Sequence, residues 1–405
     1  MLKKAVEKGT SFFKRQKSPY KVNMGRLLIQ NFSFGLTQQY QSIYITELGA
    51  TPLELGYANS LGGLASTFIT IPVGWLADRY GMKKILLTGI SIAAIGYALF
   101  GAAMSWQTTI LAIIVTTFAT QMTRIICPMI CGSSLANVER TTGMQLCDTV
   151  SAIPRLAAPV VAAFLITRFG GLSVEGIRPL YWMEVVGLLV SGFIIYKFFV
   201  NPRHRGESEP PKLTSDLKRV FEEGVMVKRW LALTILSVIP MFMAIYVPLY
   251  ARELKGATQY TIGFMDAAYY TLIVLLAIPL GIIADRFGRK KLTMLLTPIY
   301  SVSLLLIIFA PNDLTLIVGG LLSGSMWLAL VTEASLWVEV VPKDLLGSWS
   351  GIRGLLRGIM NIVSPMLGGF LWKFLGPKYV LLFLAVSQII KLPILATISS
   401  SSSTD

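Results

Sequence analysis

The stretch Ile71-Pro-Val-Gly-Trp-Leu-Ala-Asp-Arg-Tyr-Gly-Met-Lys-Lys84 decides the fold, because the chain repeats it as Ile278-Pro-Leu-Gly-Ile-Ile-Ala-Asp-Arg-Phe-Gly-Arg-Lys-Lys291. The two copies align without a gap and share the proline, the Asp-Arg pair and the Lys-Lys end. A repeat about half a chain apart indicates two similar halves. Each copy ends one apolar run and begins another, so we expect a short charged turn between two hydrophobic helices.

The composition excludes an ordinary soluble domain. Hydrophobic residues make up 54% of the chain and charged residues 14%, which leaves too little polar surface. Runs of about 20 apolar residues recur, each long enough to cross a bilayer as a helix, and helix satisfies the backbone groups within lipid. We therefore predict an all-α membrane protein with twelve transmembrane helices. The predicted spans lie near residues 24–46, 53–77, 83–105, 108–137, 143–168, 179–200, 230–252, 258–284, 290–310, 313–341, 346–372 and 378–399.

Polar segments divide the spans into two groups of six. We predict an N-terminal bundle over residues 24–200 and a C-terminal bundle over residues 230–399. Residues 201–229 form the only long polar stretch between spans and are typical of a linker. Residues 1–23 are predicted to be a basic tail, and the Ser-rich residues 400–405 a disordered end.

Lysine and arginine predict the orientation. The basic tail, both repeated turns and the linker all fall on one side of the predicted spans, and that side is expected to be cytoplasmic. We predict a multi-pass protein of the cytoplasmic membrane with both termini in the cytoplasm. This topology also accounts for the net charge of +15 without a nucleic-acid partner.

Cysteine and histidine give no sign of a metal site or an enzyme. Cys127, Cys131 and Cys147 all fall inside predicted spans, where we interpret them as small apolar filler. The only histidine, His204, lies in the linker. There is also no nucleophile–base set and no phosphate loop, so we expect no cofactor, no metal and no enzymatic activity.

The repeated turn reads Gly-x-x-x-Asp-Arg-x-Gly-x-Lys-Lys after the second and again after the eighth predicted span. With this spacing the chain resembles the major facilitator superfamily of secondary transporters over nearly its whole length. The first copy departs from the family pattern at Met82, where a basic residue is usual. The resemblance implies two pseudo-symmetric six-helix bundles that rock about a binding site halfway through the membrane.

The resemblance also implies a gating role for the repeated turns. A carboxylate at a cytoplasmic helix end is able to cap the N-terminus of another helix. By the family pattern Asp78 would face the start of the eleventh span and Asp285 the start of the fifth. We assign gating to Asp78, Arg79, Asp285, Arg286 and Arg353. Gly74 and Gly281 are expected to allow close helix approach, and the turn lysines are interpreted as topology signals only.

Polar side chains inside the membrane are candidates for the binding site, because placing them in lipid is energetically unfavourable. By the family pattern spans one, four, seven and ten line the central cavity, and several polar stripes fall on them. A proline motif in the eleventh span, Ser364-Pro365-Met-Leu-Gly368-Gly369, predicts tight helix contact between the two halves. The predicted substrate-binding residues are Asn31, Gln38, Gln39, Arg124, Tyr246, Trp327, Glu333, Arg357 and Asn361.

Buried charges should be paired, because an unpaired one is severely destabilising. We expect Arg124 to pair with Asp148, and Glu333 to pair with Arg353 or Arg357. Arg155 is expected on the same helix face as Asp148, and Glu184 in a structural pair. Without a histidine in the membrane a carboxylate must carry any coupled proton. The predicted proton-coupling residues are Asp148, Glu333 and Asp266.

These features predict a monomeric secondary active transporter surrounded by membrane lipids that moves a small molecule by alternating access. The leading hypothesis is export of amphipathic compounds in exchange for protons. One alternative is uptake or exchange of an organic anion that is recognised by intramembrane arginines. An alternative of another class is a sensor or scaffold that keeps this fold without transporting.

Overall fold

The structure is a computed structural model, and it describes residues 15–135, 146–147, 149–201, 225–340 and 346–398. Within these ranges some helical side chains, those of Asp78 and Asp285 among them, also lie outside the description. Every regular element in the described ranges is a helix. This confirms the all-α prediction.

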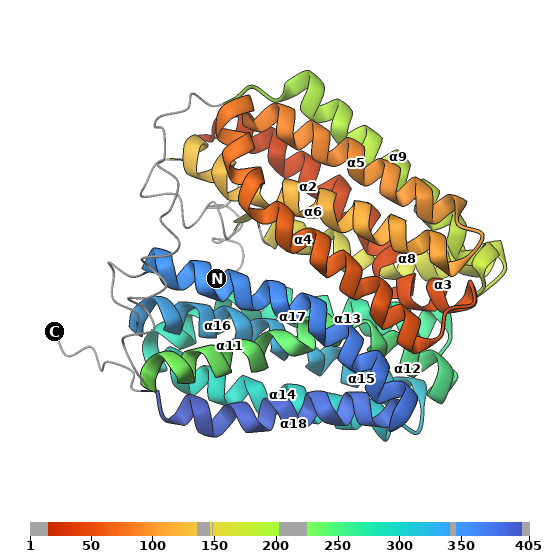
Figure 1. The fold of residues 1–405 in the computed structure, drawn as a ribbon, viewed down its shortest axis with the longest axis vertical. Coiled ribbons are helices and arrows are strands. Elements are labelled where there is room, and N and C mark those ends of the chain that lie inside the picture. The colour runs from red at the N-terminus through yellow and green to blue at the C-terminus, as the bar shows by residue number, and fades with distance from the viewer. Residues whose placement is uncertain (1–14, 136–145, 148, 202–224, 341–345, 399–405) are drawn as a thin grey trace. The chain divides into compact units, whose positions relative to one another are not determined.

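The chain divides into two compact units. Unit 1 comprises residues 1–44 and 65–208, and unit 2 comprises residues 45–64 and 209–405. The helices of unit 1 are α2 (Ser18–Thr37), η1 (Gln38–Tyr40), α5 (Met82–Ala102), α6 (Trp106–Ser134), α8 (Pro154–Phe169) and α9 (Val174–Phe198) (Figure 1). Those of unit 2 are α11 (Val225–Met243), α12 (Tyr246–Lys255), α13 (Gln259–Phe287), α14 (Arg289–Ile308), α15 (Asp313–Ser323), α16 (Ser325–Val340), α17 (Leu346–Phe374) and α18 (Pro377–Ala396). Two helices contribute residues to both units, α3 (Gln41–Glu47) and α4 (Pro52–Tyr80).

Among the described residues, each of the twelve predicted spans overlaps at least one helix. In the described part of the chain, nine helices are long and apolar enough to cross a membrane, and α11 with α12 makes a tenth if this bent pair is one span. The pair bends by 51°. Pro248 explains the break, because it has no N–H to donate to the carbonyl of Ala244 one turn earlier.

The repeated stretches contain the turns between consecutive helices, as the sequence predicts. Gly81 lies between α4 and α5 with φ of 85°, and Gly288 lies between α13 and α14 with φ of 96°. Residues with a side chain rarely adopt positive φ, so glycine is needed at both turns. Gly281 makes no close helix approach to the described residues, because none of them lies within 4 Å of the position that a Cβ would occupy there.

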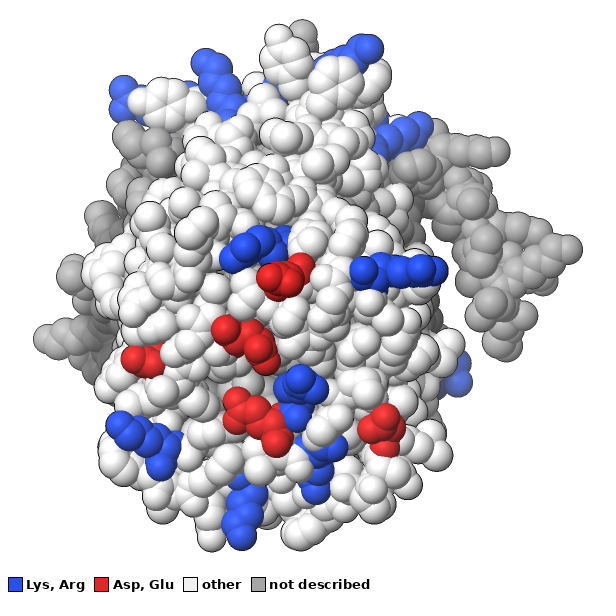
Figure 2. Space-filling model, turned by 90° about the vertical axis from the view of Figure 1, so that its right-hand side faces the viewer, with Lys and Arg blue, Asp and Glu red and all other residues white. Residues whose placement is uncertain are grey.

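Helix α9 shows how a span presents two faces. Its buried face contains Glu184, Leu188, Ser191 and Ile195. Its other face exposes Val186, Leu189, Val190, Phe193 and Tyr196. An exposed apolar stripe of this length suits contact with lipid tails rather than with water. On the face of the molecule that Figure 2 shows, charged side chains are scattered among uncharged ones and form no single basic patch.

Candidate functional site

Arg155 organises a polar cluster inside unit 1. It lies near the start of α8, and its Nε and Nη2 donate to Oδ1 of Asn31 on α2 at 3.0 and 2.8 Å. Its Nη1 makes a longer contact of 3.5 Å with Oε1 of Gln38. The guanidinium also lies over the ring of Phe34, 4.9 Å from the centroid. The cluster combines a positive charge, two amides and an aromatic face, which suits recognition of a polar group joined to an apolar body.

Close helix packing brings this cluster together. A Cβ on Gly35 would lie 2.8 Å from Cβ of Ala158, so α2 and α8 meet where only small residues fit. Asn31 also donates to the carbonyl of Leu27 at 2.8 Å, which fixes its amide so that Oδ1 accepts from Arg155. The amide is therefore oriented by its own helix before any ligand arrives.

A buried carboxylate lies close to this cluster. Glu184 of α9 is 1% exposed, and its Oε2 accepts a hydrogen bond from the hydroxyl of Thr37. Tyr97 of α5 also hydrogen-bonds to Glu184, and Arg155 is near enough to act on it electrostatically. Glu184 thus has neutral hydrogen-bond donors and a nearby cation, where the sequence predicts a structural pair with a second charged group.

The structure describes two further residues of unit 1 that the sequence predicts to bind substrate, Gln39 and Arg124. Gln39 is buried, and its amide nitrogen and oxygen have no hydrogen-bond partner among the described residues. Arg124 is exposed on α6. Its expected partner Asp148 lies outside the described residues, so that pairing stays a prediction.

Unit 2 contains a buried ion pair. Lys391 Nζ of α18 lies 2.7 Å from Glu333 Oε2 of α16. The hydroxyl of Ser237 on α11 is 2.9 and 2.7 Å from the two carboxylate oxygens of Glu333. The expectation that Glu333 pairs with Arg353 or Arg357 is corrected here, since its ion-pair partner is a lysine of α18.

The arginines of α17 make other contacts. Arg353 lies over the ring of Trp337 at 5.5 Å, and Nη2 of Arg357 lies 3.1 Å from the sulfur of Met241. Arg357 and Asn361 are half-buried, as is Asp266 on α13, and all three have further interactions. Trp327 is 38% exposed.

Tyr246 is fully buried in unit 2, where its hydroxyl contacts backbone carbonyls instead of a cavity. The hydroxyl donates to the carbonyl of Pro365 on α17 at 2.7 Å, and it is 3.2 Å from the carbonyl of Pro52 at the start of α4. A Cβ on Gly368 or Gly369 would meet atoms of Tyr246 at 2.3 or 2.9 Å. The proline motif thus makes tight helix contact within unit 2, and the predicted contact between the two halves stays a prediction.

The repeated turns are tied to nearby helix ends. In unit 1 the backbone N–H of Lys83 donates to Oδ1 of Asn201 at 2.8 Å. In unit 2 the ammonium of Lys290 donates to the carbonyls of Ala396 and Ile398 at the end of α18, at 2.8 and 2.6 Å. Lys290 therefore does more than mark topology.

The gating predictions are only partly within the described residues. The side chains of Asp78 and Asp285 lie outside them, so the latch that the resemblance implies stays a prediction. The side chains of Arg79 and Arg286 are both exposed. Arg79 lies over the ring of Tyr80 at 5.7 Å.

Three residues outside the sequence-predicted site are prominent in the structure. They are Arg155, Glu184 and Lys391. A signal for Lys391 was present, because it is a single cation inside the apolar run of the last span. For Arg155 the missing information was that α2 lies against α8, which spacing along one helix does not reveal.

Comparisons with known proteins agree with this architecture. A family model described as Major Facilitator Superfamily matches residues 27–261 and 247–397. An uncharacterized MFS-type transporter of Methanocaldococcus jannaschii is 22% identical over 88% of this chain and 92% of its own. The multidrug resistance protein MdtG of Citrobacter koseri is 26% identical over 83% of this chain and 84% of its own.

A solved structure shows the same fold. The crystal structure of the nucleoside transporter NupG covers 95% of this chain and 100% of its own, with a TM-score of 0.78 and 13% sequence identity. At this identity the likeness concerns the fold alone. Together with the repeated turns and the apolar helices, these matches show that the chain belongs to the Major Facilitator Superfamily and is a multi-pass membrane transporter.

Proposed function

We propose that the protein exports amphipathic organic compounds in exchange for protons, by alternating access across the cytoplasmic membrane, with both termini in the cytoplasm. The observation that carries this proposal is the Arg155–Asn31–Gln38 cluster with the buried Glu184 close to it. The relation to a multidrug resistance protein supports the substrate class.

The Arg155 cluster would bind the polar end of the substrate. Asn31 and Gln38 offer amide groups that donate and accept, and the guanidinium offers charge-assisted hydrogen bonds. The ring of Phe34 would receive the apolar part beside them. One broad aromatic face with few fixed polar groups suits a range of amphipathic molecules.

Glu184 is the carboxylate that we assign to the coupled proton in unit 1. A group that carries a proton must change its charge during the cycle, and burial next to a movable cation permits that change. Glu333 has a partner in Lys391 at 2.7 Å, so this ion pair would have to open during the cycle for Glu333 to carry the proton. Asp148 and Asp266 remain proposed proton carriers, as does Glu333.

The gating proposal rests on the repeated turns. Two six-helix bundles, residues 24–200 and 230–399, would rock about the central site. Asp78 and Asp285 would latch the cytoplasmic side by capping helix N-termini. Arg79, Arg286 and Arg353 would complete the latch.

A second function, uptake or exchange of an organic anion, has its own support. The charged group of the Arg155 cluster is a cation, and its fork of donors matches a carboxylate or phosphate. Arg124 and Arg357 would add to a positive cavity. This alternative predicts that substrates with a carboxylate bind more tightly than neutral amphipathic compounds.

The test is flux in proteoliposomes that contain the purified full chain and carry an imposed pH gradient. The proposal expects a neutral amphipathic compound with hydrogen-bond acceptors at its polar end to accumulate on the side from which protons leave, with proton movement reported by a trapped pH indicator. Preference for a labelled organic carboxylate supports the second function. If neither compound moves although the protein is folded, the transporter would be a sensor or scaffold and both proposals fail.

Variants of the Arg155 cluster test whether the measured flux depends on this cluster. Asn31→Ala and Arg155→Lys should each raise KM about tenfold or more, because each removes hydrogen bonds worth roughly 1.5–3 kcal/mol to a charged group. Asn59→Ala is a matched control, because Asn59 donates to its own helix at Leu55 as Asn31 does at Leu27. For the sequence-predicted carriers, unchanged pH-driven transport in both Asp148→Asn and Glu333→Gln would exclude coupling at those two sites.

A further inference from the structure

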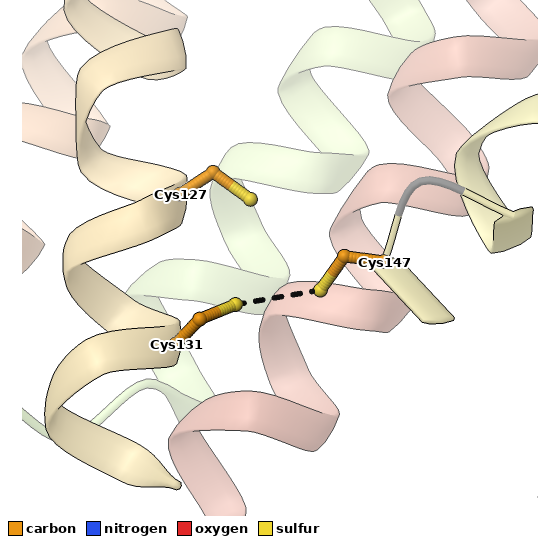
Figure 3. A group of neighbouring side chains, drawn as sticks. All are labelled: Cys127, Cys131 and Cys147. Atoms are coloured by element: carbon orange, nitrogen blue, oxygen red, sulfur yellow. Dashed lines mark hydrogen bonds between the residues drawn. The ribbon is translucent and has the colours of Figure 1, made fainter. Parts of the chain in front are cut away.

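Three cysteine sulfurs lie together in unit 1. Cys127 and Cys131 are one turn apart on α6, and Cys147 comes from the segment that precedes α8 (Figure 3). All three Sγ atoms lie within 4.8 Å of one another, and those of Cys131 and Cys147 are 3.6 Å apart. The interpretation of these residues as separate apolar filler is therefore incomplete.

The spacing of the sulfurs matches a metal site better than a disulfide. A disulfide needs an S–S distance of about 2.05 Å, and all three thiols are free. A zinc–sulfur bond is about 2.3 Å long, so sulfurs around one ion lie roughly 3.8–4 Å apart. Small movements of these three side chains would place them at that separation.

A buried cation lies near the sulfurs. Arg26 of α2 is 2% exposed and is close enough to Cys127 and Cys147 to interact with them electrostatically. Its hydrogen-bond acceptors among the described residues are the neutral oxygens of Asn23 at 3.1 Å and Gln30 at 2.6 Å. Three thiolates around a divalent ion carry one net negative charge, which the guanidinium of Arg26 would neutralise.

Asn23 joins the two features. Its Nδ2 lies 3.5 Å from Sγ of Cys127, while its Oδ1 accepts from Nε of Arg26. Outer groups that orient and neutralise metal ligands in this way are a regular part of metal sites. The buried Tyr20 adds a hydrogen bond to Cys147.

We propose that Cys127, Cys131 and Cys147 bind one thiophilic divalent metal ion of the zinc and cadmium class. On binding, three S–H bonds break, three sulfur–metal bonds form, and up to three protons leave to the buffer, with no change of oxidation state. The ion ties the end of α6 to the segment before α8. This site is separate from the Arg155 cluster and does not depend on the transport proposal.

Cadmium is the probe, because its bonds to thiolate give a charge-transfer absorption in the ultraviolet that oxygen and nitrogen ligands do not give. The purified full chain, reduced and freed of metal, is titrated with Cd²⁺. We expect one bound ion per chain, the charge-transfer band, and a thermal midpoint that rises with metal concentration. Absence of the band, or binding that saturates without it, would overturn the proposal.

Single variants identify the ligands. Cys127→Ser, Cys131→Ser and Cys147→Ser should each weaken metal binding about 100-fold or more. Asn23→Ala should weaken it about 10–100-fold, because Asn23 contacts a ligand and not the metal itself. Met129→Leu is the control, because it removes a sulfur about 200° around α6 from Cys127. A band of wild-type strength and affinity in all three cysteine variants would contradict the assignment.

A second measurement needs no variant. Wild-type protein is labelled with a maleimide with and without Cd²⁺, and the labelled cysteines are identified by mass spectrometry. The proposal expects the metal to slow labelling of all three cysteines together, by at least tenfold. If labelling rates are unchanged, or if the cysteines form a Cys131–Cys147 disulfide and exclude the metal, the site does not exist.

Discussion

Lys391 Nζ lies 2.7 Å from Glu333 Oε2 in unit 2, with both side chains almost completely buried. Removing one partner leaves an uncompensated charge, which costs about 3–5 kcal/mol, whereas removing both costs much less. We therefore expect Glu333→Gln and Lys391→Met each to lower stability strongly, and the double variant to recover a large part of the loss. Denaturant unfolding of purified protein in detergent measures this.

The control for the ion pair is Lys378→Met, which removes an exposed lysine from the same helix. It should change stability by less than about 1 kcal/mol. Additive losses in the double variant would show that Glu333 and Lys391 do not depend on each other.

Gly288 is predicted to be required for its backbone conformation alone. Its φ of 96° and ψ of 130° are rarely adopted by residues with a side chain, yet no described atom lies within 4 Å of a Cβ placed there. Gly288→Ala should therefore cost about 1–3 kcal/mol through backbone strain. Gly281→Ala, in the helix just before it, should be neutral or stabilise by up to about 1 kcal/mol. Equal thermal shifts in the two variants would contradict this account.

The close contact between α17 and Tyr246 predicts a difference between two glycines of one helix. A Cβ on Gly368 would lie 2.3 Å from Cε2 of Tyr246, so Gly368→Ala should destabilise by about 1–3 kcal/mol through overpacking. Gly354→Ala is matched, because no described neighbour lies within 4 Å there, and it should not destabilise. Thermal unfolding compares them, and similar midpoints would exclude tight packing at Gly368.

The fold was largely predictable because its signals are local. Apolar runs define helices, and the repeated turn places Gly81 and Gly288 where the chain must reverse. Both signals are read along the chain without knowing which helices touch.

The candidate site was less predictable because it depends on which helices are neighbours. The choice of Lys391 over Arg353 for Glu333 follows from α18 packing beside α11 and α14, of which α14 also packs against α16, and periodicity along α16 does not specify that. Cys147 likewise joins Cys127 and Cys131 only through tertiary packing. Small residues such as Gly35 and Ala158 determine which helices can pack closely, and a hydrophobic pattern does not distinguish them from other small apolar residues.

Glu184 gives the prediction that separates binding from proton coupling. Its carboxylate accepts from Thr37 and lies near Arg155, so Glu184→Gln preserves shape and hydrogen bonding but fixes the charge at zero. If Glu184 carries the proton, the variant should still exchange labelled for unlabelled substrate across proteoliposomes at near wild-type rates. Its accumulation driven by a pH gradient should fall at least tenfold, because the gradient no longer acts on the cycle.

The comparison needs a carboxylate on the same helix that lacks these contacts, and Glu175, an exposed residue in the first turn of α9, provides it. Glu175→Gln should leave both exchange and accumulation unchanged. Thr37→Val, which removes one donor but keeps the carboxylate, should change the pH dependence of accumulation without abolishing it. If the Glu184→Gln protein still accumulates substrate under a pH gradient, another carboxylate carries the coupled proton. Loss of exchange and accumulation together would make Glu184 a structural residue of unit 1, since its role would then be to hold α9 against α2 and not to carry charge.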